Sequence, residues 1–311
     1  KVVAAEAGAK VLQIEAEAIK KARDILAVDG PEAVSETPSL ALVREWTAFQ
    51  ESKRLANIQL VIGRAADEID GRQVPNTDPD HDWTARFFGD VQDVSSTELQ
   101  TLWAKVLAGE VERPGSTSIR TLGCLRDLDR SAAELFERFC SACIFMELEG
   151  DIIDARVSSL DRNLALDSLK PFGFAFPELN RLHVHGLVTS DFDSWQNYGR
   201  SRLHERGPHG SLGTFEVSSP GELQAGLPST PFRFQRHRWI LEADTGHRHD
   251  PMSSRVVGPS LSLAGRELSR VVECQLMPDY TKALKAFLMK QGIRMRRDLS
   301  DAPRARHNAL R

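Results

Sequence analysis

The sequence predicts a mainly α-helical protein, with an N-terminal long helical hairpin, a central helical bundle and a C-terminal winged-helix-like α+β unit. Two observations lead to this fold class. Residues 1–150 carry helical periodicity almost throughout, interrupted only by short polar or Pro/Gly-containing linkers. After Gly150, two apolar runs at 238–243 and 256–261 have the composition of strands and are separated by a polar loop.

The hairpin is expected over residues 1–75. Residues 2–28 are rich in strong helix formers and stop at the helix-terminating triplet Asp29-Gly30-Pro31. Their apolar stripe is narrow and rich in alanine. It indicates either contact with another helix, in a homo-oligomer or with another protein, or a simple surface helix. A second helix is expected from Ser39 to Asp70, with a heptad-like apolar seam formed by Leu55, Ile58, Ile62, Ala65 and Ile69.

Residues 76–150 are expected to form a compact helical domain. A short helix is expected at residues 83–88, and Ser95 with Glu98 has the spacing of a capping box for the following helix, which ends at Gly109. We expect the large apolar residues and the terminal glycine of this stretch to be structural. They are Trp83, Phe87, Phe88, Leu99, Trp103, Leu107 and Gly109.

The same stretch carries a recognisable signature. Its segments read Trp-Thr-Ala-Arg-Phe-Phe from Trp83, Leu-Gln-Thr-Leu-Trp-Ala-Lys-Val-Leu-Ala-Gly-Glu from Leu99, and Pro-Gly-Ser-Thr-Ser-Ile-Arg-Thr-Leu from Pro114. Residues 82–128 thereby resemble the bacterial family known as domain of unknown function 2806. The resemblance implies a bacterial protein from a family whose function is uncharacterised. The helical signature also looks similar to that of abortive-infection components, which implies a part in antiphage defence by analogy alone.

One turn inside the signature is the most pointed candidate site. Arg113, Gly115, Ser116, Ser118 and Arg120 surround the start of a predicted helix. Backbone amides and hydroxyls at such a position, flanked by arginines, are able to hold a phosphate or another anion. The alternative is a capped turn between helices, whose proline, glycine and serine residues serve the backbone geometry.

The second half of the chain predicts a winged-helix-like domain over residues 151–290, with an irregular insertion at 191–232, and a basic tail at 291–311. The tail predicts nucleic-acid contacts or a merely solvated segment, because its arginines lack interleaved aromatic residues. The candidate contacts are Arg294, Arg296, Arg297, Arg304 and Arg306.

No catalytic or cofactor motif is found in the sequence. Phosphate-binding glycine loops and nucleophile elbows are missing, and the histidine-rich region at 183–250 shows no set of three or four convergent ligands. Four cysteines without metal-site spacing predict reduced thiols in a cytoplasmic protein. We therefore expect no cofactor, no metal and no catalysis.

The sequence thus favours a non-enzymatic adaptor or sensor that binds itself or another protein. The alternative function is nucleic-acid binding by a winged helix and the basic tail. A net charge of −4 with 27% charged residues gives no support to a polyanion-binding surface over the whole chain. No apolar run is long enough to span a bilayer.

Overall fold

The computed structural model describes residues 38–148, 150–161, 166–197, 231–243 and 255–298. The chain divides into two compact units, and each contains segments that are distant in sequence. The helical unit consists of residues 1–130 and 263–272. The sheet unit consists of residues 131–262 and 273–311. The division at Arg130 falls inside the stretch 76–150 that the sequence suggested as one domain.

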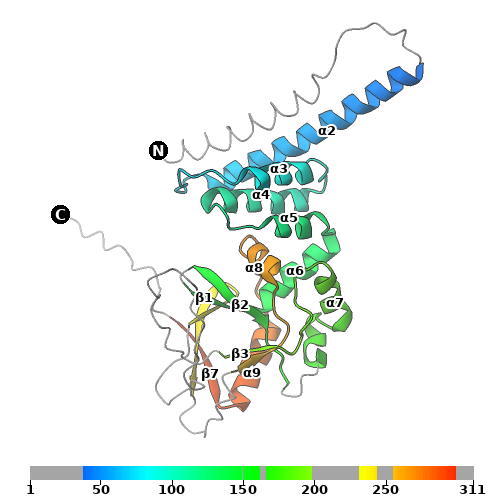
Figure 1. Cartoon of the computed structure of the whole chain (residues 1–311). Coiled ribbons are helices and arrows are strands. Elements are labelled where there is room, and N and C mark those ends of the chain that lie inside the picture. Colours follow the sequence, from blue (N-terminus) through cyan, green and yellow to red (C-terminus); the bar gives the residue numbers. More distant parts are fainter. Residues whose placement is uncertain (1–37, 149, 162–165, 198–230, 244–254, 299–311) are drawn as a thin grey trace, which may run out of the picture. The chain divides into compact units, whose positions relative to one another are not determined.

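The helical unit is built on one long helix. Helix α2 spans Pro38–Ile69, and its C-terminal half packs on α4, while α3 packs on α5 and α5 packs on α8. Figure 1 shows the N-terminal part of α2 extending beyond α3, α4 and α5. The other helices of this unit are α3 (His81–Val91), α4 (Thr97–Glu112), α5 (Ile119–Arg126) and α8 (Leu263–Leu268).

Side-chain caps fix where these helices begin. Asp80 accepts hydrogen bonds from the backbone N–H groups of Asp82 and Trp83 at the start of α3. Ser96 caps α4 by accepting from the N–H of Leu99, and its hydroxyl donates to Glu98. The expected capping box from Ser95 to Glu98 is not formed, because Ser96 is the N-cap and Glu98 therefore lies one position too early in the helix.

The sheet unit contains a five-stranded antiparallel sheet in the order β2-β1-β4-β5-β7. Strands β3 and β6 form a separate two-stranded sheet. The strands are β1 (Cys143–Leu148), β2 (Asp151–Val157), β3 (Trp195–Asn197), β4 (Phe232–Phe234), β5 (His237–Ala243), β6 (Arg255–Val257) and β7 (Ile293–Arg297). The helical elements are α6 (Arg130–Ala142), the 3-10 helix η1 (Leu166–Phe172), α7 (Phe176–Val184) and α9 (Pro278–Lys290).

Tyr280 of α9 anchors the core of the sheet unit. Its side chain is fully buried, its ring lies 6.2 Å from that of Phe234, and its hydroxyl donates to the carbonyl of Ser158 at 2.9 Å. Next to this contact, Gly258 has a φ of 146°, and a Cβ at that position would lie 2.1 Å from the carbonyl oxygen of Val157. Only glycine fits this close approach between the backbones.

The prediction of a mainly α fold with a helical hairpin was wrong, because the protein is mixed α+β. The expected first arm, at residues 2–28, lies outside the described residues, which contain a single long helix before α3. The helix expected to continue to Leu148 ends at Ala142, and a β-hairpin follows with Gly150 at its turn, where φ is 89°. Long-range pairing in the sheet overrides the local helical pattern here.

The winged-helix expectation was also wrong. The two strands expected to form a wing do not pair with each other: β5 pairs with β4 and β7, whereas β6 pairs with β3. The first part of the expected basic tail is likewise not a tail, since residues 293–297 form the edge strand β7. Alternation of buried Ile293 and Met295 with exposed arginines explains this strand.

Candidate protein-interaction surface

The turn predicted to bind an anion already surrounds a carboxylate of the chain itself. Glu110 of α4 is 1% exposed. Its two carboxylate oxygens accept from the backbone N–H groups of Gly115 and Thr117, at 2.5 Å and 2.9 Å, and from the hydroxyl of Ser116 at 3.2 Å. These donors, which would otherwise face an incoming anion, hold the end of α4 to the turn that follows it.

A second carboxylate completes the arrangement from a distant part of the sequence. Glu267 of α8 accepts from the backbone N–H of Ser118 at 2.8 Å and from the hydroxyl of Thr121 at 2.6 Å. Glu110 and Glu267 together form what we call the carboxylate clamp. Arg113 and Arg120 are exposed beside it. The arrangement supports the interpretation of a capped turn, and α8 is attached to α5 by it.

The signature residues form the core of the helical unit. The ring of Phe87 lies 5.1 Å from that of Trp83 and 5.2 Å from that of Trp103, and all three side chains are buried. Leu107 is buried with them, while Phe88, Leu99 and Gly109 are half-buried. The large apolar side chains of the signature therefore contribute packing within the helical unit.

Three of the five arginines predicted to contact nucleic acid lie among the described residues. Arg294, Arg296 and Arg297 are exposed on β7, and Arg304 and Arg306 lie outside the described residues. The guanidinium of Arg296 donates to Glu242 at 2.7 Å, and Arg297 is hydrogen-bonded to His237. Pairing with Glu242 offsets part of the positive charge on which binding to phosphates would depend.

The cysteines are packed as apolar residues. Cys140, Cys143 and Cys274 are buried in the sheet unit, and burial raises the pKa of each thiol above its ordinary value. A raised pKa keeps a thiol protonated and therefore a poor nucleophile and metal ligand. Over the described ranges, no cluster of three or more His, Cys, Asp or Glu side chains is arranged to hold a metal ion.

The feature that the sequence reading missed is an exposed apolar face on α2. Trp46, Phe49 and Leu60 are 63%, 61% and 51% exposed, and the rings of Trp46 and Phe49 lie 6.1 Å apart. With exposed Lys53 and Ala56, these residues recur at steps of three and four, as in a coiled-coil seam. We call these five positions the outward seam.

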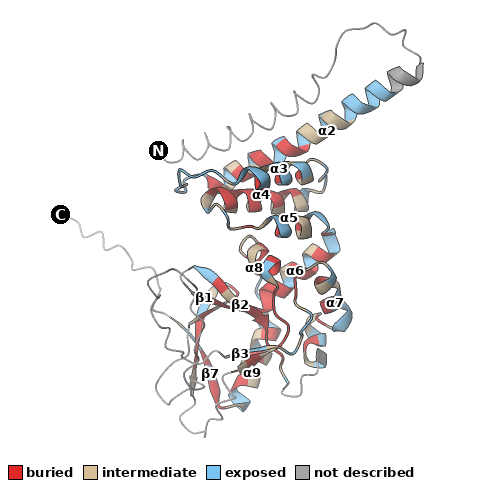
Figure 2. Cartoon of the chain, viewed as in Figure 1, coloured by how far each residue is buried: buried red, intermediate tan, exposed pale blue. Residues whose placement is uncertain are grey.

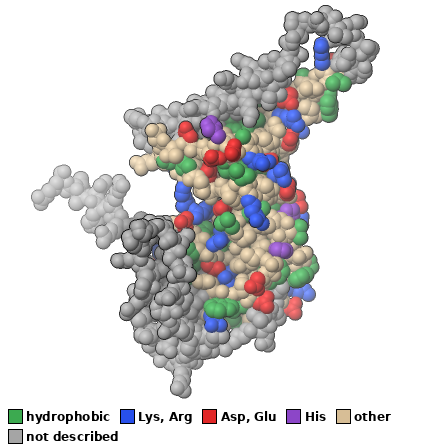
Figure 3. Space-filling view, viewed as in Figure 1, with side chains coloured by type: hydrophobic (Ala, Val, Ile, Leu, Met, Phe, Trp, Pro, Cys, Tyr) green, Lys and Arg blue, Asp and Glu red, His purple; other side chains and the backbone are tan. Residues whose placement is uncertain are grey.

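The rest of α2 shows why this face stands out. Ile58, Ile62, Ala65 and Ile69 are buried on the face that packs toward α4, so only one side of the C-terminal half is used within the helical unit. Figure 2 shows the projecting part of α2 as exposed, and Figure 3 shows hydrophobic side chains on it. Steps of three and four between Trp46, Phe49, Lys53, Ala56 and Leu60 are visible in the sequence, but they overlap with the seam that the helical unit buries.

The match to a known family includes both the outward seam and the aromatic core of the helical unit. Residues 43–158 match the model of a family described as Protein of unknown function (DUF2806). The resemblance found in residues 82–128 is thereby confirmed, and the match extends from Val43, three residues before the seam begins at Trp46, to the residue after β2. No curated protein and no solved structure matches the chain. None of the described helices combines the length and apolar character needed to cross a bilayer.

Proposed function

We propose that this chain is a non-enzymatic adaptor or sensor that binds another protein chain through the outward seam of α2. The exposure of Trp46 and Phe49 on a projecting helix is the observation that supports the proposal. Aromatic side chains contribute large apolar areas to interfaces and are enriched among residues that dominate binding energy. Burying the parts of these two side chains that remain in water would provide about 1–2 kcal/mol per side chain.

The position of the seam adds a second line of support. It lies within the family-matched residues 43–158, so this part of α2 belongs to the matched domain and is not an appendage to it. Among the described residues, the carboxylates of the clamp and the buried thiols are engaged in internal contacts. Binding, and not catalysis, is therefore the activity we propose for a cytoplasmic protein.

The test is site-specific photo-crosslinking in cells that express the full chain. A benzophenone amino acid replaces Phe49, and the matched control replaces Ala48, which is also exposed but lies off the seam. We expect a crosslinked product containing a second polypeptide for the probe at Phe49 and none for the probe at Ala48. No product at Phe49, or only an internal crosslink to residues 1–37, would overturn the proposal.

We place this binding activity in bacterial antiphage defence, on the ground of the signature's likeness to abortive-infection components. The expected outcome is that a strain lacking the gene becomes more sensitive to phage in plating assays. The wild-type gene restores resistance, whereas Trp46→Glu with Phe49→Glu does not. Equal plating of all strains over a broad phage panel would contradict the defence role and leave the binding surface to be judged by the crosslinking result.

A further inference from the structure

We infer that the partner on the outward seam is a second copy of this chain, with the two α2 helices antiparallel. The inference rests on the proposed function and names its partner. Between Trp46 and Leu60 the seam extends for about 21 Å along the helix. This length is already helical within a folded unit, so pairing does not have to supply the cost of forming the helix.

The sizes of the seam residues favour an antiparallel pair. When Phe49 of one copy is set opposite Lys53 of the other, the same register sets Trp46 opposite the partner's Ala56. Each large ring then faces a small side chain or a flexible one, and the two-fold symmetry repeats both contacts. Alternation of large and small side chains across a helix pair is how such layers interdigitate.

The charge within the seam favours the same orientation. In an in-register parallel pair, Lys53 would face Lys53 of the other copy, which places two like charges inside the contact. In the antiparallel register, the Lys53 ammonium lies over the ring of the partner's Phe49, a cation–π arrangement. Trp46 would meet Trp46 in the parallel pair, where two of the largest side chains compete for one layer.

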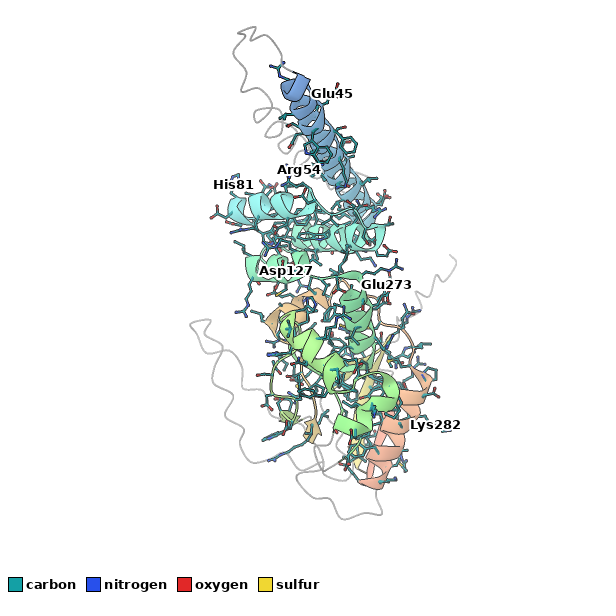
Figure 4. All side chains as sticks on the ribbon, turned by 90° about the vertical axis from the view of Figure 1, so that its right-hand side faces the viewer. Glu45, Arg54, His81, Asp127, Glu273 and Lys282 are labelled. Carbon is teal, nitrogen blue, oxygen red and sulfur yellow. The ribbon has the colours of Figure 1, made fainter. Side chains whose placement is uncertain are left out.

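The side chains that flank the seam on one side are also compatible with this register. Glu45 faces the partner's Gln59, and Ser52 faces the partner's Ser52, so no like charges meet along this side. All three side chains are exposed. Figure 4 labels Glu45 on the projecting part of α2 and Arg54 nearer to the other helices of the unit.

The first experiment measures the mass of the full chain by light scattering over a range of concentrations. We expect a dimer of the 34.6 kDa chain that persists in high salt. Trp46→Ala with Phe49→Ala should weaken dimerisation about 100-fold or more, since each substitution acts twice in a symmetric pair. The matched control is Leu276→Ala, which removes a side chain that is 60% exposed elsewhere and should leave the mass unchanged.

Disulfide trapping then decides the orientation, in a Cys124→Ser background that removes the half-buried native thiol. Ser52→Cys should form a crosslinked dimer on oxidation, whereas Glu45→Cys alone should not. Mixing Glu45→Cys with Gln59→Cys should restore the crosslink. A dimer trapped by Glu45→Cys alone would overturn the antiparallel arrangement.

The outcomes separate this inference from the proposed function. A strictly monomeric protein whose Phe49 photo-crosslinks to a different polypeptide would overturn self-association and retain the interaction surface. A monomer with no crosslink at Phe49, or with only an internal one, would overturn both. A dimer that is indifferent to Trp46→Ala and Phe49→Ala would overturn the seam as its contact.

Discussion

The two faces of α2 carry similar apolar residues but differ in whether the chain covers them. Ile62 is 2% exposed and faces α4, whereas Leu60, two residues earlier, is 51% exposed on the outward seam. Farther toward the N-terminus, Trp46 and Phe49 are more exposed still. The comparison teaches that periodicity establishes which residues share a helix face, but not whether that face is covered by the same chain.

The largest difference in stability is expected between substitutions of Ile62 and Leu60, which lie on opposite faces of α2. Ile62→Ala removes buried packing and is expected to lower the free energy of unfolding by about 2–5 kcal/mol. Leu60→Ala should change it by less than about 0.5 kcal/mol in the monomer. Urea unfolding of each variant, at protein concentrations too low for association, measures the difference. Equal losses for the two variants would mean that Leu60 is packed within the monomer.

A second prediction separates internal clamping from ligand binding. Glu267→Gln keeps the shape of the side chain but removes the charge that strengthens the bonds from Ser118 and Thr121. We expect the free energy of unfolding to fall by about 1–3 kcal/mol. Asp67→Asn, at an exposed carboxylate on α2, is the matched control and should have little effect. If Glu267→Gln leaves stability unchanged but weakens or strengthens phosphate binding, the turn is an anion site after all.

The buried thiols predict a moderate pH dependence. Burial raises the pKa of Cys140 and Cys143 in the folded state, so their contribution to stability is present below the ordinary thiol pKa of about 8.5 and is lost as the pH rises above it. Thermal unfolding between pH 7 and pH 10 should show this decline. Alkylation of the native protein should modify half-buried Cys124 first. Rapid modification of Cys143 would contradict its burial.

The smallest effect is expected at the edge strand. Arg296 is exposed and pairs with Glu242, and exposed pairs contribute little to stability. Arg296→Ala should therefore leave the unfolding midpoint unchanged within experimental error. Under the proposed function, mixed-sequence DNA should not alter the mass of the protein at physiological salt. DNA binding that weakens steeply with salt and is lost in Arg296→Ala would instead establish the nucleic-acid alternative.

Local sequence chemistry predicted the helical signature well. Gly109 lies in the last turn of α4 and accepts the cap hydrogen bond from Arg113, so that helix runs only three residues past the expected end. Trp83, Phe87 and Trp103 are buried as their type and spacing indicated. Such features depend on residues a few positions apart, for which side-chain chemistry and helical periodicity are sufficient.

Features that depend on distant residues were missed. The strand Cys143–Leu148 follows a helix without a break in its apolar pattern, and only its pairing with β2 and β4 makes it a strand. The turn that the sequence suggested as an anion site is instead capped by two carboxylates of the chain. Glu110 is local, but Glu267 comes from 146 residues beyond Thr121. Nothing in the turn's own residues indicates that partner.

The sequence by itself determined the family signature, the helical core around Phe87 and the apolar seam of α2 from Leu55 to Ile69, because these follow from local composition and spacing. The tertiary structure decided that the chain is α+β, that α8 returns to clamp α5, and that one seam is covered while the other is exposed. These outcomes depend on which distant segments meet. Burial and pairing free energies belong to those contacts and not to any single segment.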